Sequence, residues 1–390
     1  MAKFKEYILV INSGSATLKF KVFHQNNFSV AVFGIVEKIG LEGSFIKIEE
    51  TLSKRMIMKN YPEGIADHQQ ALQIVLSHLK HWKRKIRIIG HRVVHGGQDF
   101  TKPTVITKKN LSQLEKYNEL APLHNPINLA CITTCLKTLP SIKNVAVFDT
   151  SFYKTIPDYA YLYAIPFQYY LDFKIRRYGF HGISHNYVAL KTAERLKKPL
   201  TKLKIITCHL GSGCSITAVK FGKAIATSMG FTPLEGITMG TRSGDLDPSV
   251  AFFLMHKLNL GIEEMTEILN KKSGLLGIFG YSNDMRDIMI AAGYKIPGYQ
   301  ATKKFNQKEK KQGQLALKIF VYHIVRYIGS YATLMGGANY IVFTAGIGER
   351  NPIIRNLIMK EVRKAWPKVK SLVIPTNEEL MIAQQTKNFN

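Results

Sequence analysis

The sequence predicts an α/β protein built from two related domains, and three observations support this prediction. At 390 residues the chain is long for a single hydrophobic core. Apolar runs typical of buried strands alternate with segments of helical spacing. An opening stretch, ILVINSGSATLKFKVF, also has an echo in the middle of the chain, IITCHLGSGCSITAVK. A repeated motif of this kind indicates a duplicated fold with two similar halves.

The first half of the chain alternates strands with helices. In order, we expect a strand hairpin at residues 7–23, extended chain to about residue 58, an amphipathic helix at 68–82, a buried strand ending in a glycine turn at 86–97, two helices around a proline-bounded loop at 122–126, and a buried strand at 145–152. This alternation predicts a first domain at residues 1–150, joined by the C-terminal segment 380–390. The second domain is expected at 151–379.

The second half repeats the strand pattern and adds a glycine-rich turn before a helix. Residues 203–229 read as a strand, a Gly/Ser turn and two further strands. Residues 339–366 read as strand, glycine turn and helix, with Gly346 and Gly348 beside the helix start. Free backbone N–H groups and the helix dipole at such a start favour an anion or a nucleotide.

The charge balance is strongly basic. Lys and Arg total 54 against 27 Asp and Glu, a formal net charge of +27. A basic surface attracts nucleic acid, anionic membranes and acidic metabolites alike. The lysines are scattered, however, with the densest clusters at 80–87 and 303–311, and no nucleic-acid-binding fingerprint accompanies them. We therefore expect solvated faces and no nucleic-acid partner.

Cysteine usage and hydropathy indicate the compartment. The four cysteines form no Cys-x-x-Cys pair, which favours reduced thiols. No segment approaches the roughly 20 apolar residues of a membrane helix, and the first apolar run is too short for a signal-peptide core. We therefore expect a cytoplasmic protein without a membrane partner.

Three turns that follow apolar strands are candidates for phosphate binding: Asn12–Ser15, His209–Gly213 and Ala345–Glu349. Lys19 lies shortly after the first of them. The chain has no Walker A motif and no Rossmann glycine pattern after a predicted strand, so a bound nucleotide would be held by several dispersed turns. Small polar residues also make ordinary turns, and each turn alone is weak support.

Charged residues within apolar or turn segments are candidates for chemistry. Arg92 lies in GHRVVHGG, Arg242 in MGTRSGDLDP and His181 in RRYGFHGISH, and Asp149 ends a predicted strand. An arginine in an apolar stretch is costly unless it is paired. Either these arginines form salt bridges, with Asp149 or Asp245 as partners, or they bind an oxyanion, whose geometry suits the guanidinium fork.

The motifs together resemble those of the acetate kinases. They occur in order from about residue 6 to residue 384: VINSGSATLKF, GHRVVHGG, LAPLHNP, VFDTSF, RRYGFHGISH, CHLGSGCS, TSMGFTPLEGITMGTRSGDLDP, NKKSGLLGI, SNDMRDI, FTAGIGER and PTNEEL. The resemblance implies the actin-like ATPase fold, a duplicated ribonuclease-H-like domain pair with an interdomain cleft. It also implies a homodimer.

The resemblance implies reversible, direct in-line transfer of a phosphoryl group from ATP to acetate, giving acetyl phosphate and ADP. Arg92 and Arg242 would clamp the acetate carboxylate and the phosphoryl group, and His181 would donate to a phosphoryl oxygen. Because acetate is already ionised at pH 7, Asp149 would not act as a general base. We expect it to orient an arginine or a metal-bound water.

The resemblance also implies a metal and a nucleotide site. Asn12 and Glu378 would hold Mg²⁺, or Mn²⁺ as an alternative, mainly through waters. Glu379, the neighbour of Glu378, stays open for that role. The residues expected to hold ATP are Lys19, His209, Leu210, Gly211, Ser212, Gly213, Asp284, Met285, Arg286, Ala345, Gly346, Ile347, Gly348 and Glu349.

The acetate methyl group would sit in a small apolar pocket of Val94, Leu123, Phe180 and Pro233. The alternatives are a propionate or butyrate kinase of the same fold, or a basic ATP-binding or nucleic-acid-binding protein that has lost transfer. The sequence departs from the family pattern at Ser212, where Asn is usual, and at Arg350, also in place of Asn. The stretch 293–311 is longer and more basic than usual.

Overall fold

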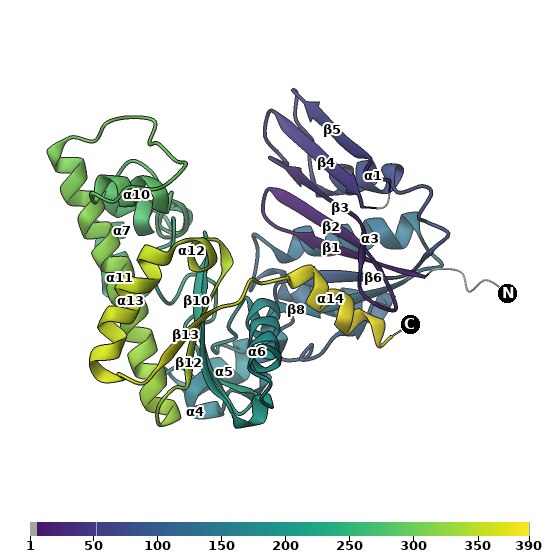
Figure 1. Ribbon diagram of the computed structural model, residues 1–390. Coiled ribbons are helices and arrows are strands. Elements are labelled where there is room, and N and C mark those ends of the chain that lie inside the picture. The colour runs from purple at the N-terminus through teal and green to yellow at the C-terminus, as the bar shows by residue number, and fades with distance from the viewer. Residues whose placement is uncertain (1–5, 52, 390) are drawn as a thin grey trace. The chain divides into compact units, whose positions relative to one another are not determined.

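The computed structural model describes residues 6–51 and 53–389. It confirms the mixed α/β class, and the chain forms two compact units (Figure 1). The first unit contains residues 1–154, 182–184 and 377–390, and the second contains residues 155–181 and 185–376. Each unit is built on one β-sheet.

The first unit has an eight-stranded sheet in the order β5-β4-β3-β2-β1-β6-β8-β7. Its strands are β1 (Tyr7–Ser13), β2 (Thr17–His24), β3 (Val30–Glu37), β4 (Ser44–Glu50), β5 (Met56–Tyr61), β6 (Ile86–Val93), β7 (Thr104–Val105) and β8 (Lys143–Phe148). The central strand β1 pairs antiparallel with β2 and parallel with β6, and β6 pairs parallel with β8. The predicted opening hairpin is thus confirmed.

The second unit has a five-stranded sheet in the order β11-β10-β9-β12-β13. Its strands are β9 (Lys204–Leu210), β10 (Cys214–Lys220), β11 (Lys223–Thr227), β12 (Tyr340–Thr344) and β13 (Lys370–Val373). Here β9 pairs antiparallel with β10 and parallel with β12, and β12 pairs parallel with β13. This repeats the β3-β2-β1-β6-β8 core of the first unit, so the duplication inferred from the hairpin echo is confirmed.

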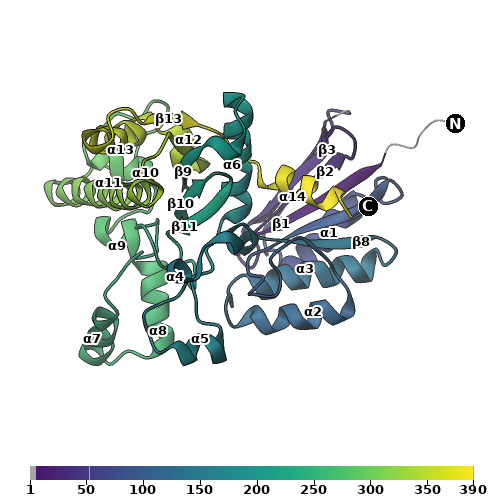
Figure 2. The ribbon, with the colours of Figure 1, turned by 90° about the horizontal axis from the view of Figure 1, so that it is seen from below.

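Helices cover both faces of the first sheet. They are α1 (His68–His78), α2 (Lys108–Glu115), α3 (Asn125–Thr138) and α14 (Glu378–Lys387). Helices α1 and α3 pack over one face, and α14 crosses β1, β6 and β8 on the other (Figures 1 and 2). The approach of α14 requires Gly90 on β6, because a Cβ atom there would lie 2.3 Å from Thr386 Oγ1. The last helix of the chain is thereby docked on the first unit.

The second unit carries the remaining α-helices: α4 (Asp158–Tyr161), α5 (Phe167–Phe173), α6 (Gly182–Leu196), α7 (Pro248–Leu258), α8 (Ile262–Glu267), α9 (Gly274–Phe279), α10 (Met285–Ala291), α11 (Gln307–Met335), α12 (Ala345–Arg350) and α13 (Pro352–Ala365). The first turn of α6, residues 182–184, is grouped with the first unit. The 29-residue helix α11 packs on α9, α10, α13 and strands β9 and β10.

Several predicted element boundaries differ from the structure. Helix α1 ends at His78, where the expected helix continued to residue 82. Pro126 lies in the first turn of α3 and not in the loop, because proline is compatible with a helix start where its missing N–H is not needed. The strand expected at 145–152 ends at Phe148, and Asp149 begins a 3₁₀ helix, Asp149–Thr155.

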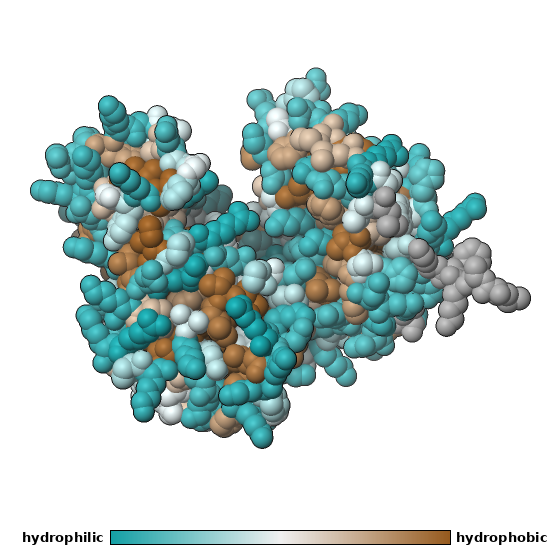
Figure 3. Space-filling model, viewed as in Figure 1, coloured by the Kyte–Doolittle hydropathy of each residue, from teal (hydrophilic) through white to brown (hydrophobic). Residues whose placement is uncertain are grey.

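The surface is largely hydrophilic on the face that Figure 3 shows, with small hydrophobic patches. In the part of the chain that the structure describes, no helix is both long and apolar enough to cross a membrane. Cys131, Cys135, Cys208 and Cys214 are all buried and free of disulfides. Burial raises the pKa of each thiol, to about 12 for Cys131 and Cys214, which keeps these cysteines protonated and inert.

Candidate active site

Three predicted site residues meet at the carboxyl ends of neighbouring strands in the first unit. Asn12 lies near the end of β1, Arg92 near the end of β6, and Asp149 directly after β8. Because β1, β6 and β8 are parallel, their carboxyl ends meet at one edge of the sheet, where open α/β sheets bind ligands. Arg92 donates to Asp149 Oδ2 from Nε at 3.1 Å and from Nη2 at 2.7 Å.

Helix α14 brings two carboxylates to the same place. Asn12 Nδ2 donates to Glu378 Oε2 at 3.2 Å and to Glu379 Oε1 at 2.9 Å, while Asn12 Oδ1 accepts from Arg92 Nη1 at 3.3 Å. This network fixes the orientation of the amide, because a carboxylate can only accept and a guanidinium can only donate. The other oxygen of Glu379 pairs with Lys21 Nζ at 3.1 Å.

The charges of this cluster stabilise one another. Burial alone would lower the pKa of Arg92, but the nearby charges of Asp149 and Glu378 outweigh it and raise that pKa. Burial likewise would raise the pKa of Glu379, but Lys21 and the amide of Asn12 hold that pKa below its ordinary value. Arg92 therefore stays cationic and Glu379 anionic at neutral pH.

The carboxylate cluster fits a hydrated magnesium ion. Mg²⁺ prefers oxygen ligands, keeps several waters and is usually held by one or two carboxylates. Glu379 uses both oxygens on Lys21 and Asn12, whereas Glu378, which is only half-buried, receives one hydrogen bond among the described residues, from Asn12 at 3.2 Å. Glu378 thus has the spare acceptor capacity, and Asn12 holds its side chain in place.

The remaining predicted residues of the first unit lie around this edge. Lys19 on β2 is exposed and is the register partner of Asn12 on β1. Val94 is buried, and its backbone N–H donates to Asn128 Oδ1 at 3.0 Å. Asn128 Nδ2 also donates to Ser13 Oγ at 2.8 Å, so one asparagine holds both the Val94 backbone and the first turn. Leu123, in the loop before α3, is 51% exposed.

In the second unit, histidines gather around Ser215. The rings of His181 and His209 stack with centroids 4.3 Å apart. Ser215 Oγ lies 2.9 Å from His181 Nδ1 and 2.7 Å from His185 Nε2. His181 precedes helix α6 in a left-handed conformation, with φ of 57°, which is strained for a residue with a side chain. Such strain, held by the surrounding contacts, is typical of functional positions.

Arg242 lies beside the His209–Gly213 turn. A Cβ atom on Gly213 would lie 3.3 Å from His181 Cε1 and 3.7 Å from Arg242 Nη1, so both side chains approach this turn. Arg242 Nη1 donates to the carbonyl oxygen of Pro233 at 3.3 Å. Within the described chain Arg242 forms no ion pair, and burial lowers its pKa. Phe180 next to His181 is buried, and Pro233 is half-buried.

Of the two alternatives weighed for the arginines, the structure shows the salt bridge for Arg92 and no carboxylate partner for Arg242 among the described residues. Arg92 has a buried carboxylate partner in Asp149. Asp245, the other suggested partner, instead accepts from Arg326 and from Tyr327, so it does not neutralise Arg242. Burying a guanidinium without a carboxylate partner costs folding free energy, and an anionic ligand beside Arg242 would offset that cost.

The expected nucleotide turns of the second unit are linked to one another. Gly240 N donates to the carbonyl oxygen of Ser212 at 3.1 Å, and a Cβ atom on Gly240 would lie 3.7 Å from Asn283. Arg286 pairs with Asp284, which caps α10. The third segment, expected as a turn, is instead the short helix α12, and the N–H of Ala345 at its start donates to Glu349 Oε1 at 2.8 Å. Gly346 has open space beside its Cα.

The other members of these turns have more ordinary positions. Leu210 and Met285 are buried, while Gly211 and Ile347 are half-buried. Gly348 is buried, and its carbonyl oxygen accepts from Arg355. These residues shape the turns and do not present side-chain charges.

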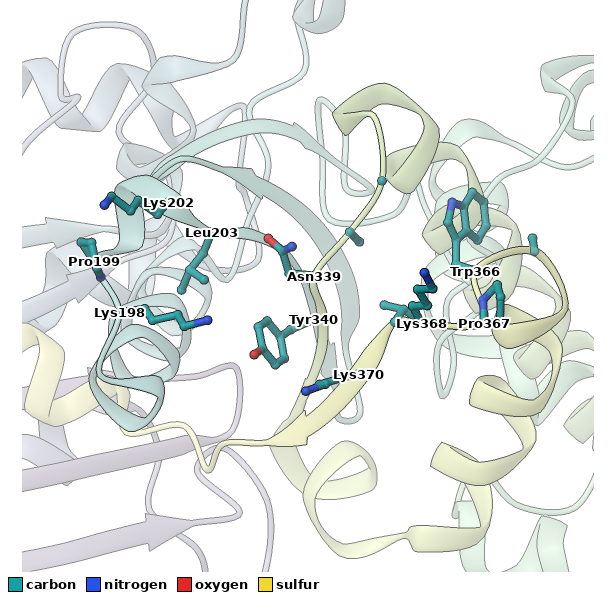
Figure 4. Close-up of a pocket in the computed structure, with 14 residues that line it drawn as sticks. Lys198, Pro199, Lys202, Leu203, Asn339, Tyr340, Trp366, Pro367, Lys368 and Lys370 are labelled. Atoms are coloured by element: carbon teal, nitrogen blue, oxygen red, sulfur yellow. The ribbon is translucent and has the colours of Figure 1, made fainter.

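A cavity of about 790 Å³ lies elsewhere in the second unit, at the amino ends of β9, β12 and β13 (Figure 4). Lysines line it, including Lys202 and Lys370. Helices α6, α11 and α13 all end at this cavity, and the negative ends of helix dipoles attract lysines. Lys204 Nζ indeed donates to the carbonyl oxygen of Gly336, at the end of α11. Among its described lining residues there is no carboxylate, histidine or cysteine.

Comparison with known proteins identifies the family. The model of the acetokinase family matches residues 7–366 of the chain. The chain belongs to the acetokinase family. It is 47% identical over 411 residues to the acetate kinase of Thermoanaerobacter pseudethanolicus and 46% identical over 413 residues to that of Thermotoga maritima, with 98% of each chain covered in both cases.

Solved structures of the acetokinase family have the same fold. A propionate kinase from Francisella tularensis subsp. tularensis superposes with a TM-score of 0.87 and 37% identity, and acetate kinase from Porphyromonas gingivalis superposes with 0.84 and 37%. Each alignment covers 98% of this chain and 99% of the other. The duplicated two-domain fold of the actin-like ATPases, predicted from the motifs, is therefore confirmed.

Sequence reasoning missed Lys21, Asn128 and Ser215 as supports of the site. Lys21 could have been found, because residues two apart on a strand lie on the same face, and Lys19 was already singled out. Ser215 and Asn128 carry no such local signal. Their partners lie 34 and 115 residues away in the chain, so only the fold reveals them.

Proposed function

We propose that this protein is an acetate kinase, which transfers the γ-phosphoryl group of ATP to acetate and runs the reaction in reverse from acetyl phosphate and ADP. The observation that carries this proposal is the family match along nearly the whole chain, with 44–47% identity to proteins named acetate kinase. The charged clusters of the two units supply the groups that such a transfer requires.

In the first unit, Arg92 would bind the substrate oxygens. Its guanidinium is oriented by Asp149, which is almost completely buried, whereas the Arg92 side chain is still 16% exposed. Phosphoryl transfer depends mostly on positioning and on cations around the transferred group, because the charge is spread over its oxygens. Asp149 therefore acts by holding Arg92, since ionised acetate has no proton to lose at neutral pH.

In the second unit, Arg242 and His181 would stabilise the transferred phosphoryl group. Both lie at the Gly213 turn, and Arg242 lacks a carboxylate partner among the described residues. ATP would be held by Lys19 and by the turns at 209–213, 284–286 and 345–349. Removing one such donor from the charge that develops in a transition state typically costs ~10²–10³ in rate.

The family implies a divalent metal, and the donor set around Asn12 fits Mg²⁺. Glu378 would hold the ion, and Asn12 would hold Glu378, with waters completing the coordination. When bound, Mg²⁺ would neutralise charge on the terminal phosphates of ATP. Arg92 keeps its own contacts to Asp149 and Asn12 and is not a metal ligand.

A propionate kinase is the second candidate, because a protein of that name is a close structural neighbour. We infer that acetate is preferred, since the β-branched Val94 of the expected pocket leaves little room beyond a methyl group. We also infer a homodimer that works in the cytoplasm, as the resemblance implies. One missing or extra methylene changes discrimination by only about 1–3 kcal/mol, so propionate would be a poor substrate and not an excluded one.

The proposal is tested with a hydroxamate assay on the purified protein with ATP and Mg²⁺. We expect kcat/KM to fall in the order acetate, propionate, butyrate, and an Arg242→Ala variant to lose at least a hundredfold with acetate. A DNA-binding titration at increasing salt runs alongside. Absence of acyl phosphate from any of the three acids, together with salt-sensitive DNA binding, would refute the kinase and favour the ATP-binding protein without transfer.

A further inference from the structure

The long, basic segment between α10 and α11 is folded against the start of α10. This segment, residues 292–306, contains Tyr299, whose Oη donates to Asp287 Oδ1 at 2.9 Å. The Cζ atom of Arg286 lies 4.1 Å from the centroid of the Tyr299 ring. One tyrosine therefore contacts two consecutive residues of α10 (Met285–Ala291), one through its hydroxyl and one through its face.

Arg286 is held on a second side by Asp284. Its Nη2 lies 2.6 Å from Asp284 Oδ2, and its Nε lies 3.1 Å from Oδ1. Asp284 itself caps the helix by accepting from the N–H of Arg286 at 2.8 Å. Within the described chain, no hydrogen bond involves Nη1 of Arg286, and its side chain is 54% exposed. The guanidinium is thus fixed in orientation but still accessible.

The segment 292–306 has a second set of contacts, with residues at and just before the start of the turn 281–287. Thr302 hydrogen-bonds the hydroxyl of Tyr281, and the Nζ atom of Lys303 lies 4.5 Å from the centre of the Tyr281 ring. The Phe305 ring packs edge-on against Phe279 at 5.4 Å. The segment therefore holds the turn 281–287 at both ends. A half-exposed arginine would otherwise sample several rotamers, and this contact removes that freedom before a ligand arrives.

We propose that Tyr299 is a positioning residue for the nucleotide: its ring fixes the plane of Arg286, and its hydroxyl fixes Asp287, so that the free edge of the guanidinium is presented to a nucleoside phosphate. This inference rests on the proposed function, in which the turn at 284–286 binds ATP. It assigns to the long segment a role in substrate affinity and none in the transfer step. Arginine suits such stacking because its guanidinium is planar.

The alternative is that Tyr299 only anchors the segment. A structural anchor would change the melting temperature, but it would not act on nucleotide affinity through Arg286. The two roles are separated by a double-mutant cycle, in which Tyr299→Leu is made alone and together with Arg286→Ala. Tyr294→Leu serves as the matched control, since Tyr294 belongs to the same segment and contacts neither Arg286 nor Asp287 in any described interaction.

The measurements are the dissociation constant of MgATP by calorimetry, KM for ATP and for acetate, and kcat. We expect Tyr299→Leu to weaken ATP binding about five- to tenfold, because it loses a cation–π contact and a hydrogen bond. Tyr299→Phe, which keeps the ring, should weaken it about twofold. KM for acetate and kcat should stay within twofold of wild type, as should every constant of Tyr294→Leu.

In the Arg286→Ala background, Tyr299→Leu should have no further effect on ATP binding. The inference is overturned if Tyr299→Leu binds ATP like wild type, or if its effect is equally large without Arg286. Wild-type ATP affinity in Arg286→Ala would overturn it together with the assigned role of the turn. If the pattern is seen in a protein that makes no acyl phosphate, the inference stands and the proposed function fails.

Arg286→Lys covers the case in which Tyr299→Leu does not fold, as judged by its melting curve. Lysine keeps the charge but cannot present a planar guanidinium against Tyr299. We expect its ATP affinity to fall close to that of Arg286→Ala. An affinity equal to wild type would show that a positive charge suffices, and the positioning role of Tyr299 would be rejected.

Discussion

Replacement of Asp149 by asparagine is expected to impair both stability and turnover. The carboxylate is fully buried, and its Oδ2 accepts both hydrogen bonds from Arg92. Asparagine keeps the shape and one acceptor but removes the charge. Removing one partner of a buried ion pair lowers the free energy of unfolding by about 3–5 kcal/mol. Glu378 and Glu379 still face Arg92, so we expect the lower end, about 3 kcal/mol.

For a unit of this size, about 3 kcal/mol corresponds to a fall in melting temperature of roughly 6–12 °C. Because Arg92 loses the partner that orients it, kcat/KM for acetate should fall by ~10²–10³ at pH 7. Scanning calorimetry and the hydroxamate assay measure these effects. Asp99→Asn, at an exposed carboxylate bonded to Tyr117, is the control and should change neither. Retention of most activity in Asp149→Asn would refute a charge-based role.

Three further outcomes follow from the first unit. Glu379→Gln should destabilise the protein by about 1.5–3 kcal/mol at pH 7, because Lys21 loses a charged partner. The folded pKa of Glu379 lies below its ordinary 4.5, so the stability difference between wild type and variant is complete above that pH and disappears as the pH falls through the folded pKa. Urea titrations in which the two stabilities do not converge at low pH would contradict the pairing. Gly90→Ala should cost about 1–3 kcal/mol by pushing on Thr386 and Ile382, and should raise the Mg²⁺ concentration needed for half-maximal activity. Thr386→Ala in the same chain should restore both only in part, because Ile382 Cγ2 would still lie 2.8 Å from the added Cβ atom. Val94→Ala should raise the ratio of kcat/KM for propionate over acetate about tenfold, and an unchanged ratio would argue against this residue lining the pocket.

The two strand hairpins could be predicted because they are encoded locally. In both hairpins an apolar strand precedes a Gly/Ser turn and an alternating strand, and each feature is visible within about 15 residues. The exact ends of the strands and helices were harder to predict. Phe148 ends its strand although a further apolar residue, Phe152, follows shortly after it, because the chain turns into a 3₁₀ helix where Asp149 meets Arg92.

The candidate site was only partly predictable, because many of its contacts join residues that lie far apart in the chain. Arg92 and Asp149 could be singled out, since a charged residue in an apolar run conflicts with its surroundings. That these two pair with each other, while Arg242 has no carboxylate partner in the described chain, depends on contacts across many residues. The supporting roles of Asn128 and Ser215 depend on such contacts as well.

The docking of α14 explains why the carboxylates of the last helix belong to the first sheet. Gly90 leaves the space that Thr386 fills, and this contact places the start of α14 beside the end of β1. Asn12 then donates to both Glu378 and Glu379, whereas of these two carboxylates Lys21 pairs with that of Glu379 in the described chain. Two adjacent glutamates that look equivalent in the sequence therefore have different environments. One is neutralised to hold the helix, and the other is left with the acceptor capacity that a hydrated metal ion requires.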